Sequence, residues 1–573
     1  MAARRLHPLL LDLWVAALAL LLVLPAYAHA GLGLAGDLVF SPRQPLTLDS
    51  LGLGDRLPRA VPLDALLGLA GSVVPGAVLF RLAVVAGIAL AGSAVHRIVA
   101  GGSTVARLAA ATLAVWNPYV VERLALGQWA LLLGYGATCW VVLTVVRWRA
   151  APPSTPWAPW AWVGLASFTP TGGAIGTVVA VVLGAGRSTR TRLLLVGCLA
   201  LQLPWVLPSL LGAGGGTGDP TGVVAFRAGP DTPGGTLVSL LGLGGIWDLE
   251  SVPTSRSSML GVLAAVLAVT AVVLAWRRLP PGVGRLLPIA LGGLLLAWAA
   301  RLPGLDEVVR WVVTDVPGGG LVRDSQKWVL PWVVLVAVSF GVLVDRVREL
   351  VARRDAGLAA VAGIVGVVLP LVLLPDAAST TWPTTTPVTY PRDFDTVRSE
   401  LADDPDHGAM LLLPWRAYRA FEWGGDRTAN DPAYAWFDVP LIGSTALPVG
   451  DQVVGEDDPD LAADVAAALD GADRAAALAD LGVGWVLVYP DDPDAPDVDL
   501  DGLDLVVDGG DLQLWRVPGA VADRDGVSAW VVILVVGVDV AVLLFWIFAC
   551  VSALWRRSPD SLPAFRTDRD EWA

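Results

Sequence analysis

The feature that most constrains this chain is a series of long apolar runs, which recurs along most of its 573 residues. The runs begin near Leu9, continue to Leu374, and return close to the end of the chain at Ala529–Trp555. A helix needs about 20 mostly apolar residues to cross the hydrocarbon core of a bilayer. Charged residues make up only 16% of the chain, whereas ordinary soluble domains carry about 25%. The sequence therefore predicts a mainly α-helical, polytopic membrane protein.

Charge divides the chain into parts with different surroundings. Residues 374–526 hold 31 Asp or Glu against 8 Arg, a net charge of −23, while the rest of the chain has a net charge of +9. An acidic segment without long apolar runs is predicted to lie in water. We therefore expect a membrane domain at 1–374, an acidic α/β domain at 375–526, and a transmembrane helix with a tail at 527–573. The absence of a basic patch excludes nucleic acid as a partner.

The arginine clusters predict the topology, because basic residues are kept on the cytoplasmic side of a membrane. They fall on one side if Trp157–Gly184 is a broken or re-entrant pair of short helices that meet near Thr169–Gly173. This gives about 12 helical segments, with both termini cytoplasmic and the acidic domain extracytoplasmic. The first run resembles a signal peptide, but its length and the topology favour a retained helix in the plasma membrane.

Short elements replace the long runs in the acidic domain. Ser379–Pro387 is rich in Ser, Thr and Pro and is predicted to be an extended linker. Met410–Leu413 and Trp485–Tyr489 are typical of buried strands, and Asp460–Leu481 has the spacing of a helix. Leu505–Val507 and Leu512–Val517 flank an Asp-Gly-Gly-Asp turn and predict a hairpin. Together these signals indicate a small α/β domain.

Asp37 is the candidate catalytic residue of the first outward loop. It follows the first helix closely, so it is expected near the membrane surface. A carboxylate there can act as a general base on an acceptor hydroxyl or help to bind a metal. The alternative is a solvated loop residue, and Asp49, Asp55 and Asp64 are competitors in the same loop.

Arg323 and Lys327 are the candidate contacts of a donor phosphate. They lie at the predicted outer end of a spanning helix, and a spacing of four places both on one face if the helix begins early. Arginine offers a forked contact to phosphate, and lysine offers a point charge. The alternative is ordinary snorkelling of basic side chains to the interface. Lys327 is the only lysine of the chain, and outward basic residues are uncommon, which favours anion binding.

A polar hinge separates two of the predicted spans at 116–129. Charged residues at this depth are costly unless they are paired or line an aqueous cleft. A cleft and a simple loop ion pair are both consistent with the sequence. If the hinge lines a cleft, the residues concerned are Asn117, Tyr119, Glu122, Arg123 and Gln128.

A partial match to a calcium-binding loop lies in the acidic domain. Asp497, Asp499, Asp501 and Asp508 follow the ligand spacing in part, but position eight is Asp504 where an apolar residue is expected. The flanking residues favour strands over helices, so a solvated acidic loop is the alternative. Beyond this weak candidate, no metal-ligand motif is found in the sequence, and a divalent cation is left open.

Several segments of the predicted membrane domain and of the acidic domain resemble the multispanning GT-C glycosyltransferases. Within them the resemblance is to actinobacterial arabinofuranosyltransferase-like proteins and to bacterial proteins that glycosylate lipoteichoic acids. The scarcity of lysine and the abundance of Ala, Val and Gly are typical of a GC-rich, actinobacterial genome. The resemblance covers most of the chain but is diffuse. The segments that carry it are Asp37, Asn117-Pro118-Tyr119, Gly127-Gln128-Trp129, Arg323 to Trp328, Leu412 to Trp415, Leu481 to Val488 and Leu512 to Gly519.

The resemblance implies an enzyme that transfers a sugar from a polyprenyl-phosphate donor to a cell-envelope glycan or glycolipid outside the membrane. Asp37 matches the acidic residue of the family's first outward loop, and Arg323 and Lys327 match its basic pair. Many such enzymes carry a second acidic residue or an Asp-x-Asp pair in the early loops, which this chain lacks beside Asp37. Two alternatives stay open: an inactive glycosyltransferase-like scaffold that binds a lipid glycan, and a transporter of lipid-linked glycans.

Overall fold

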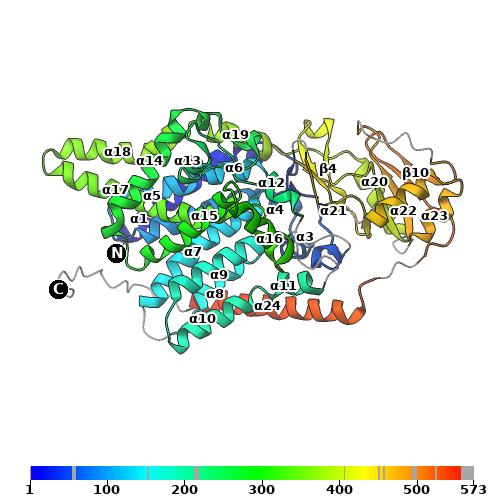
Figure 1. Cartoon of the computed structure of the whole chain (residues 1–573), viewed down its shortest axis with the longest axis horizontal. Helices are drawn as coiled ribbons and strands as arrows, with labels where there is room; N and C mark the ends of the chain where they lie inside the picture. The colour runs from blue at the N-terminus through cyan, green and yellow to red at the C-terminus, as the bar shows by residue number, and fades with distance from the viewer. Residues whose placement is uncertain are drawn as a thin grey trace.

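The chain forms a long helical body with an α/β domain at one end, as Figure 1 shows for the computed structural model. The helices up to Leu373 and the last helix, Ala529–Trp555, form the body, and the α/β domain lies between them in the chain. The structure describes residues 2–54, 60–150, 154–211, 219–404, 407–449, 452–455, 459–492, 500–522 and 526–555.

Apolar helices build the body, and their buried sides share one large hydrophobic core. Among the described residues, six helices are long and apolar enough to cross a membrane, or seven if the bent pair α10 and α11 counts as one span. The predicted count of about 12 segments stays a prediction. The six are α4 (Gly76–Ile98), α7 (Trp129–Ala150), α14 (Met259–Ala275), α17 (Leu330–Ala352), α18 (Ala356–Leu373) and α24 (Ala529–Trp555). The other helices of the body are α1 (Ala2–Leu22), α5 (Thr104–Val115), α8 (Trp157–Ala166), α9 (Pro170–Gly184), α10 (Thr189–Ala200), α11 (Leu203–Leu211) and α15 (Leu286–Ala299).

The broken segment predicted at Trp157–Gly184 is confirmed as two short helices, α8 and α9. Thr169 caps the N-terminus of α9 by accepting a hydrogen bond from the Gly172 backbone N–H at 3.2 Å. Both helices pack against α7, so the irregular backbone between them is covered by protein.

Short elements lie between the long helices and the α/β domain. Ser379–Pro387 was predicted to be extended, but most of it forms the helix α19. Thr381 and Thr385 donate hydrogen bonds to carbonyls of this helix, and Thr381 and Thr384 donate to the distant carbonyls of Leu22 and Ala125, both at 2.6 Å. The contacts to Leu22 and Ala125 outweigh the weak helix propensity of threonine. The short helices here are α2 (Leu24–Ala28), α3 (Leu63–Gly71), α6 (Pro118–Ala125), α12 (Thr221–Ala225), α13 (Gly235–Leu241), α16 (Leu305–Asp315) and α19 (Ala377–Thr385).

A five-stranded mixed sheet with order β10-β11-β9-β3-β6 forms the centre of the α/β domain. The predicted buried strands and the predicted hairpin are confirmed, and the predicted helix is divided into α22 and α23. β3 is parallel to β9 and β6, and β11 is antiparallel to β9 and β10. The sheet strands are β3 (Ala409–Leu413), β6 (Leu441–Ile442), β9 (Val483–Val488), β10 (Asp504–Asp508) and β11 (Gln513–Arg516). The domain's other elements are α20 (Asp393–Asp403), α21 (Ala433–Trp436), α22 (Pro459–Asp470), α23 (Arg474–Asp480), β4 (Tyr418–Ala420), β5 (Thr428–Asn430), β7 (Leu447–Val449) and β8 (Gln452–Val454).

Candidate functional site

A short hairpin, β1 (Leu34–Ala35) and β2 (Leu38–Val39), joins the helical body to the α/β domain. Leu34 is buried in the core of the α/β domain, whereas Leu38 and Phe40 are buried in the core of the body. The backbone N–H of Gly36 donates to the Thr428 carbonyl at 2.8 Å, and the N–H of Asn430 donates to the Gly36 carbonyl at 2.9 Å. Asp37 therefore lies where the two cores meet.

Gly36 allows the hairpin to touch the polar hinge between α6 and α7. Its φ of +55° is in the left-handed region, and a Cβ atom built on it would lie 2.2 Å from the Leu126 carbonyl oxygen. Gly127 makes the reciprocal approach, because its Cβ would lie 2.9 Å from the Asp37 backbone nitrogen. Only residues without a Cβ atom fit at both positions. The hinge and Asp37 are thus held together by backbone packing.

Replacing Gly36 with Ala is expected to loosen this contact while leaving the helical body folded. The left-handed conformation costs about 1–2 kcal/mol for an L-residue, and the clash with Leu126 adds to it. Limited proteolysis of the 31–41 segment is expected to become faster than in the original protein. The control is Gly425→Ala, which has a φ of +73° but whose Cβ meets no atom closer than 4.0 Å. Equal proteolysis of the two variants would contradict the close packing.

The helix α6 carries two consecutive charged residues, Glu122 and Arg123, whose side chains belong to two different buried networks. Glu122 and Arg123 do not pair with each other, although the sequence left a loop ion pair open. Their exposed fraction is 0%, and Asn117 and Tyr119 are also buried. That these residues line a cleft stays a prediction. Asn117 caps α6 by accepting a hydrogen bond from the Val120 backbone N–H. Protein partners satisfy the polar groups of Asn117 and Arg123, whereas Glu122 Oε1 is buried without a hydrogen-bond partner among the described residues.

Arg123 forms the first network with Asp324. Its guanidinium donates to both Asp324 oxygens, at 2.6 and 3.0 Å, and to Gln128 at 2.7 Å. Gln326 accepts from Arg123 and donates to the Gly244 carbonyl at 3.1 Å. Burial raises the pKa of Asp324, but the Arg123 and Lys327 cations outweigh it and hold the pKa at about 2. The carboxylate is therefore ionised and forms ion pairs with both Arg123 and Lys327.

Lys327 shares Asp324 with Arg123. Its Nζ lies 3.4 Å from Asp324 Oδ2, and its side chain remains 23% exposed, whereas that of Arg123 is fully buried. α17 begins only at Leu330, so Arg323 and Lys327 lie on irregular 3₁₀ turns and not on one helical face as the sequence suggested. Tyr119 holds this turn in place by donating its hydroxyl hydrogen to the Lys327 carbonyl at 3.0 Å.

Glu122 forms the second network with Asp231 and Arg256. Arg256 donates to both Asp231 oxygens at 2.8 and 2.9 Å, and all three side chains are buried. Glu122 accepts a hydrogen bond from the Ile246 backbone N–H at 3.2 Å. Burial and the nearby Asp231 charge raise the pKa of Glu122 well above its ordinary value. The cluster therefore combines one ion pair with a carboxyl group whose charged form is disfavoured by burial.

Arg323 and Asp37 complete the cationic region. The Arg323 guanidinium lies 4.7 Å from the centre of the Phe226 ring, in a cation–π arrangement. Asp37 is exposed, and its Oδ1 accepts a hydrogen bond from the Tyr418 hydroxyl of β4 at 2.8 Å. The charges of Asp37 and Arg323 both act on the Lys327 ammonium group. The structure thus brings Asp37 close to Lys327 and Arg323, which lie far from it in the sequence.

The other sequence candidates lie elsewhere. Asp497 and Asp499 of the calcium-loop prediction fall outside the described residues, whereas Asp501 lies in a turn and Asp508 ends β10. Across the described ranges, no group of three or more His, Cys, Asp or Glu side chains is arranged to hold a metal ion. Sequence reasoning missed Tyr418 and the Asp231–Arg256 pair, because neither belongs to a recognisable motif.

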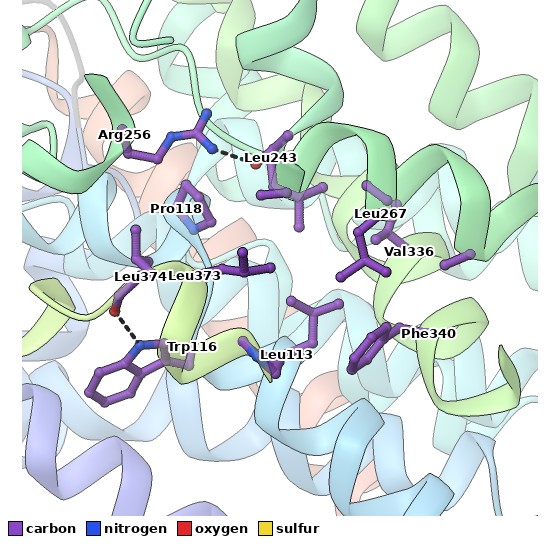
Figure 2. A pocket seen from close by; sticks show the side chains of 15 residues that line it. Leu113, Trp116, Pro118, Leu243, Arg256, Leu267, Val336, Phe340, Leu373 and Leu374 are labelled. Atoms are coloured by element: carbon purple, nitrogen blue, oxygen red, sulfur yellow. Dashed lines mark hydrogen bonds between the residues drawn. The ribbon is translucent and has the colours of Figure 1, made fainter. Parts of the chain in front are cut away.

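An apolar pocket lies inside the helical body, with Arg256 at one end and Phe340 at the other (Figure 2). It contains about 490 Å³ of empty space, including the part that opens to the surroundings. Trp116 closes part of its wall by donating its indole N–H to the Leu374 carbonyl at 2.8 Å. Its walls come mainly from α5, α14, α17 and α18. Arg256 belongs to both this pocket and the Glu122 network.

Comparison of the fold with solved structures finds membrane glycosyltransferases. The cryo-EM structure of arabinofuranosyltransferase AftD from Mycobacteria superposes with a TM-score of 0.52 and 18% identity, over 89% of this chain and 40% of that chain. A mutant form of the same protein gives a TM-score of 0.51 and 18% identity, over 90% of this chain and 42% of that chain. This chain thus spans about two fifths of the length of those proteins.

Comparisons by sequence find no match, neither among family models nor among curated proteins. At 18% identity the structural likeness concerns the fold alone. The likeness in fold agrees with the resemblance seen in the sequence. It also agrees with the presence of apolar helices that are long enough to cross a membrane. The chain is therefore a multi-pass membrane protein with a GT-C-type, glycosyltransferase-like fold.

Proposed function

We propose that this protein transfers a sugar from a polyprenyl-phosphate donor to a cell-envelope glycan on the extracytoplasmic face of the plasma membrane. The observation that carries the proposal is the meeting of an exposed carboxylate with cationic side chains where the two domains join. Asp37 lies there, and its charge acts on Lys327. A base and a phosphate contact are the two groups that such a transfer needs.

Lys327 and Arg323 are proposed to hold the donor phosphate. The leaving phosphate gains charge as the glycosidic bond breaks, so preorganised cations stabilise the transition state more than the ground state. Asp324 keeps Lys327 in place, and Phe226 does the same for Arg323. Both side chains are only partly buried, which leaves room for a lipid headgroup to approach.

Asp37 is proposed to act as the general base toward the acceptor. Its carboxylate would take the proton of an acceptor hydroxyl while the hydroxyl oxygen forms a bond to the anomeric carbon. The bond from that carbon to the phosphate oxygen breaks, and the lipid phosphate leaves with the electron pair. An attack opposite to the leaving group inverts the anomeric configuration.

The apolar pocket in the body is proposed to take part of the donor's prenyl chain. Its lining is almost entirely hydrocarbon, as expected for a site that binds an isoprenoid. Its Arg256 end lies near the Arg123 network, because Arg256 donates to the Gly242 carbonyl and Gln326, which accepts from Arg123, donates to the Gly244 carbonyl two residues later. The proposed partners are thus the prenyl-phosphate sugar, the acceptor glycan or glycolipid, and membrane lipids.

Replacing Lys327 with Ala is expected to raise the donor KM by about 10- to 100-fold, because one charge-assisted contact to phosphate is lost. The effect on the unfolding temperature should be small, since partly exposed ion pairs contribute about 0–1 kcal/mol. Transfer from a prenyl-phosphate sugar, measured in membranes over a donor series, checks this. The control is Arg278→Ala, which breaks an exposed ion pair to Glu349 far from the site. An unchanged donor KM in Lys327→Ala would refute the phosphate contact.

A scaffold without activity remains the second candidate, because Lys327 is partly neutralised by the shared Asp324 carboxylate. Glycan analysis of a deletion strain separates the two. One missing sugar linkage supports the enzyme, whereas a general loss of envelope polymer with normal linkages supports the scaffold.

A further inference from the structure

The strand β4 places two neighbouring side chains on opposite faces, as strand geometry requires. Arg419 points into the α/β domain, where its exposed fraction is 1%. Its Nε donates to Asp431 Oδ2 at 2.6 Å, and its guanidinium also donates to the Pro414 carbonyl at 2.8 Å. Tyr489 donates to the other Asp431 oxygen at 2.6 Å. This buried network fixes the position of β4 within the domain.

Tyr418 occupies the opposite face of β4 and reaches across to the helical body. It pairs in register with Asn430 of β5, and β5 is the strand that bonds to the Gly36 backbone. The Tyr418 hydroxyl donates to Asp37 Oδ1 at 2.8 Å, across 381 residues of sequence. Figure 1 shows β4 on the side of the α/β domain that faces the body. The contact is therefore formed only when the two domains are docked.

We propose that Tyr418 is a positioning residue for the base Asp37, so that the α/β domain completes the catalytic site. This inference rests on the proposed function. A hydrogen bond to Oδ1 fixes the rotation of the exposed carboxylate. Oδ2 is then the oxygen that takes the acceptor proton, while Tyr418 keeps its own proton throughout. Lys327 acts on Asp37 from the body, and Tyr418 contacts it from β4.

The test is the variant Tyr418→Phe, assayed as full-length protein in membranes. We expect kcat to fall by about 10- to 100-fold, with donor KM unchanged within about twofold, because a hydrogen bond to a charged group is lost and the phosphate contacts remain. A merely structural defect would lower the amount of folded protein, whereas loss of the positioning hydrogen bond lowers kcat per folded protein and leaves the donor KM unchanged.

The matched control is Tyr434→Phe, which removes the same hydroxyl from the same domain. The Tyr434 hydroxyl lies near Gly443 on the β6 side, where a Cβ would be 3.3 Å away. This variant should keep the original kcat and donor KM. A Tyr418→Phe variant with unchanged kcat would overturn the positioning role.

A second comparison separates this inference from the proposed function. If Asp37→Asn is inactive and Tyr418→Phe behaves like the original protein, the positioning role fails and the base role stands. If neither variant affects transfer, the base role of Asp37 fails and the positioning role fails with it. If both are impaired, adding Tyr418→Phe to Asp37→Asn should cause no further loss, because the hydrogen bond acts through the Asp37 carboxylate.

Discussion

Replacing Asp37 with Asn is expected to reduce sugar transfer by about 100- to 10,000-fold, which is the range that a general base contributes. Asparagine has almost the same shape but cannot take a proton from the acceptor hydroxyl. Asp37 is exposed, so its own burial contributes little to folding. Loss of activity should therefore occur in a protein with unchanged expression and unfolding temperature. The measurement is transfer from a prenyl-phosphate sugar in membranes, at saturating donor and acceptor.

The control for this variant comes from the same loop. Asp64→Asn makes the same change in the first turn of α3, and this residue was a competitor for the role of base in the sequence. It should leave the transfer rate within about twofold of the original, as surface substitutions usually do. Full activity of Asp37→Asn, or an equal loss in Asp64→Asn, would remove Asp37 from the mechanism.

Replacing Arg123 with Ala is expected to cost about 3–5 kcal/mol of stability, because it leaves a buried charge without its main partner. Asp324 and Gln326 both accept hydrogen bonds from Arg123, whose side chain is fully buried. The same change removes the group that keeps Asp324 in place beside Lys327. Thermal and denaturant unfolding of the purified protein in nanodiscs should show the loss directly.

A double variant tests whether the cost arises from the uncompensated carboxylate. Arg123→Met with Asp324→Leu replaces the ion pair by apolar side chains and should recover much of the stability lost in Arg123→Ala. It should not recover transfer, because Lys327 no longer has its anchor. The matched control is Arg348→Ala, which removes a partly exposed partner of Asp345. A loss below about 1 kcal/mol in Arg123→Ala, comparable to this control, would contradict the buried network.

The amino-acid sequence by itself determined the large divisions of the molecule. Apolar runs near the length of a bilayer indicate spanning helices wherever they occur, because backbone groups in hydrocarbon must bond within the segment. The Asp-Gly-Gly-Asp turn predicted the hairpin of β10 and β11, because the conformation of a tight turn depends on the few residues that form it. The break between α8 and α9 was visible for the same local reason.

Tertiary structure alone decided which charges meet. Arg123 and Asp324 are 201 residues apart, and Tyr418 and Asp37 are 381 apart, so no spacing rule connects them. The threonine-rich segment failed as a linker for a similar reason: its helix α19 is held by contacts to Leu22 and Ala125, which lie far away in the chain. A polar side chain in an apolar segment is predicted to be buried with a partner, but the sequence does not indicate which residue that partner is. The tertiary structure decides the partner, because burying a polar group without one costs free energy.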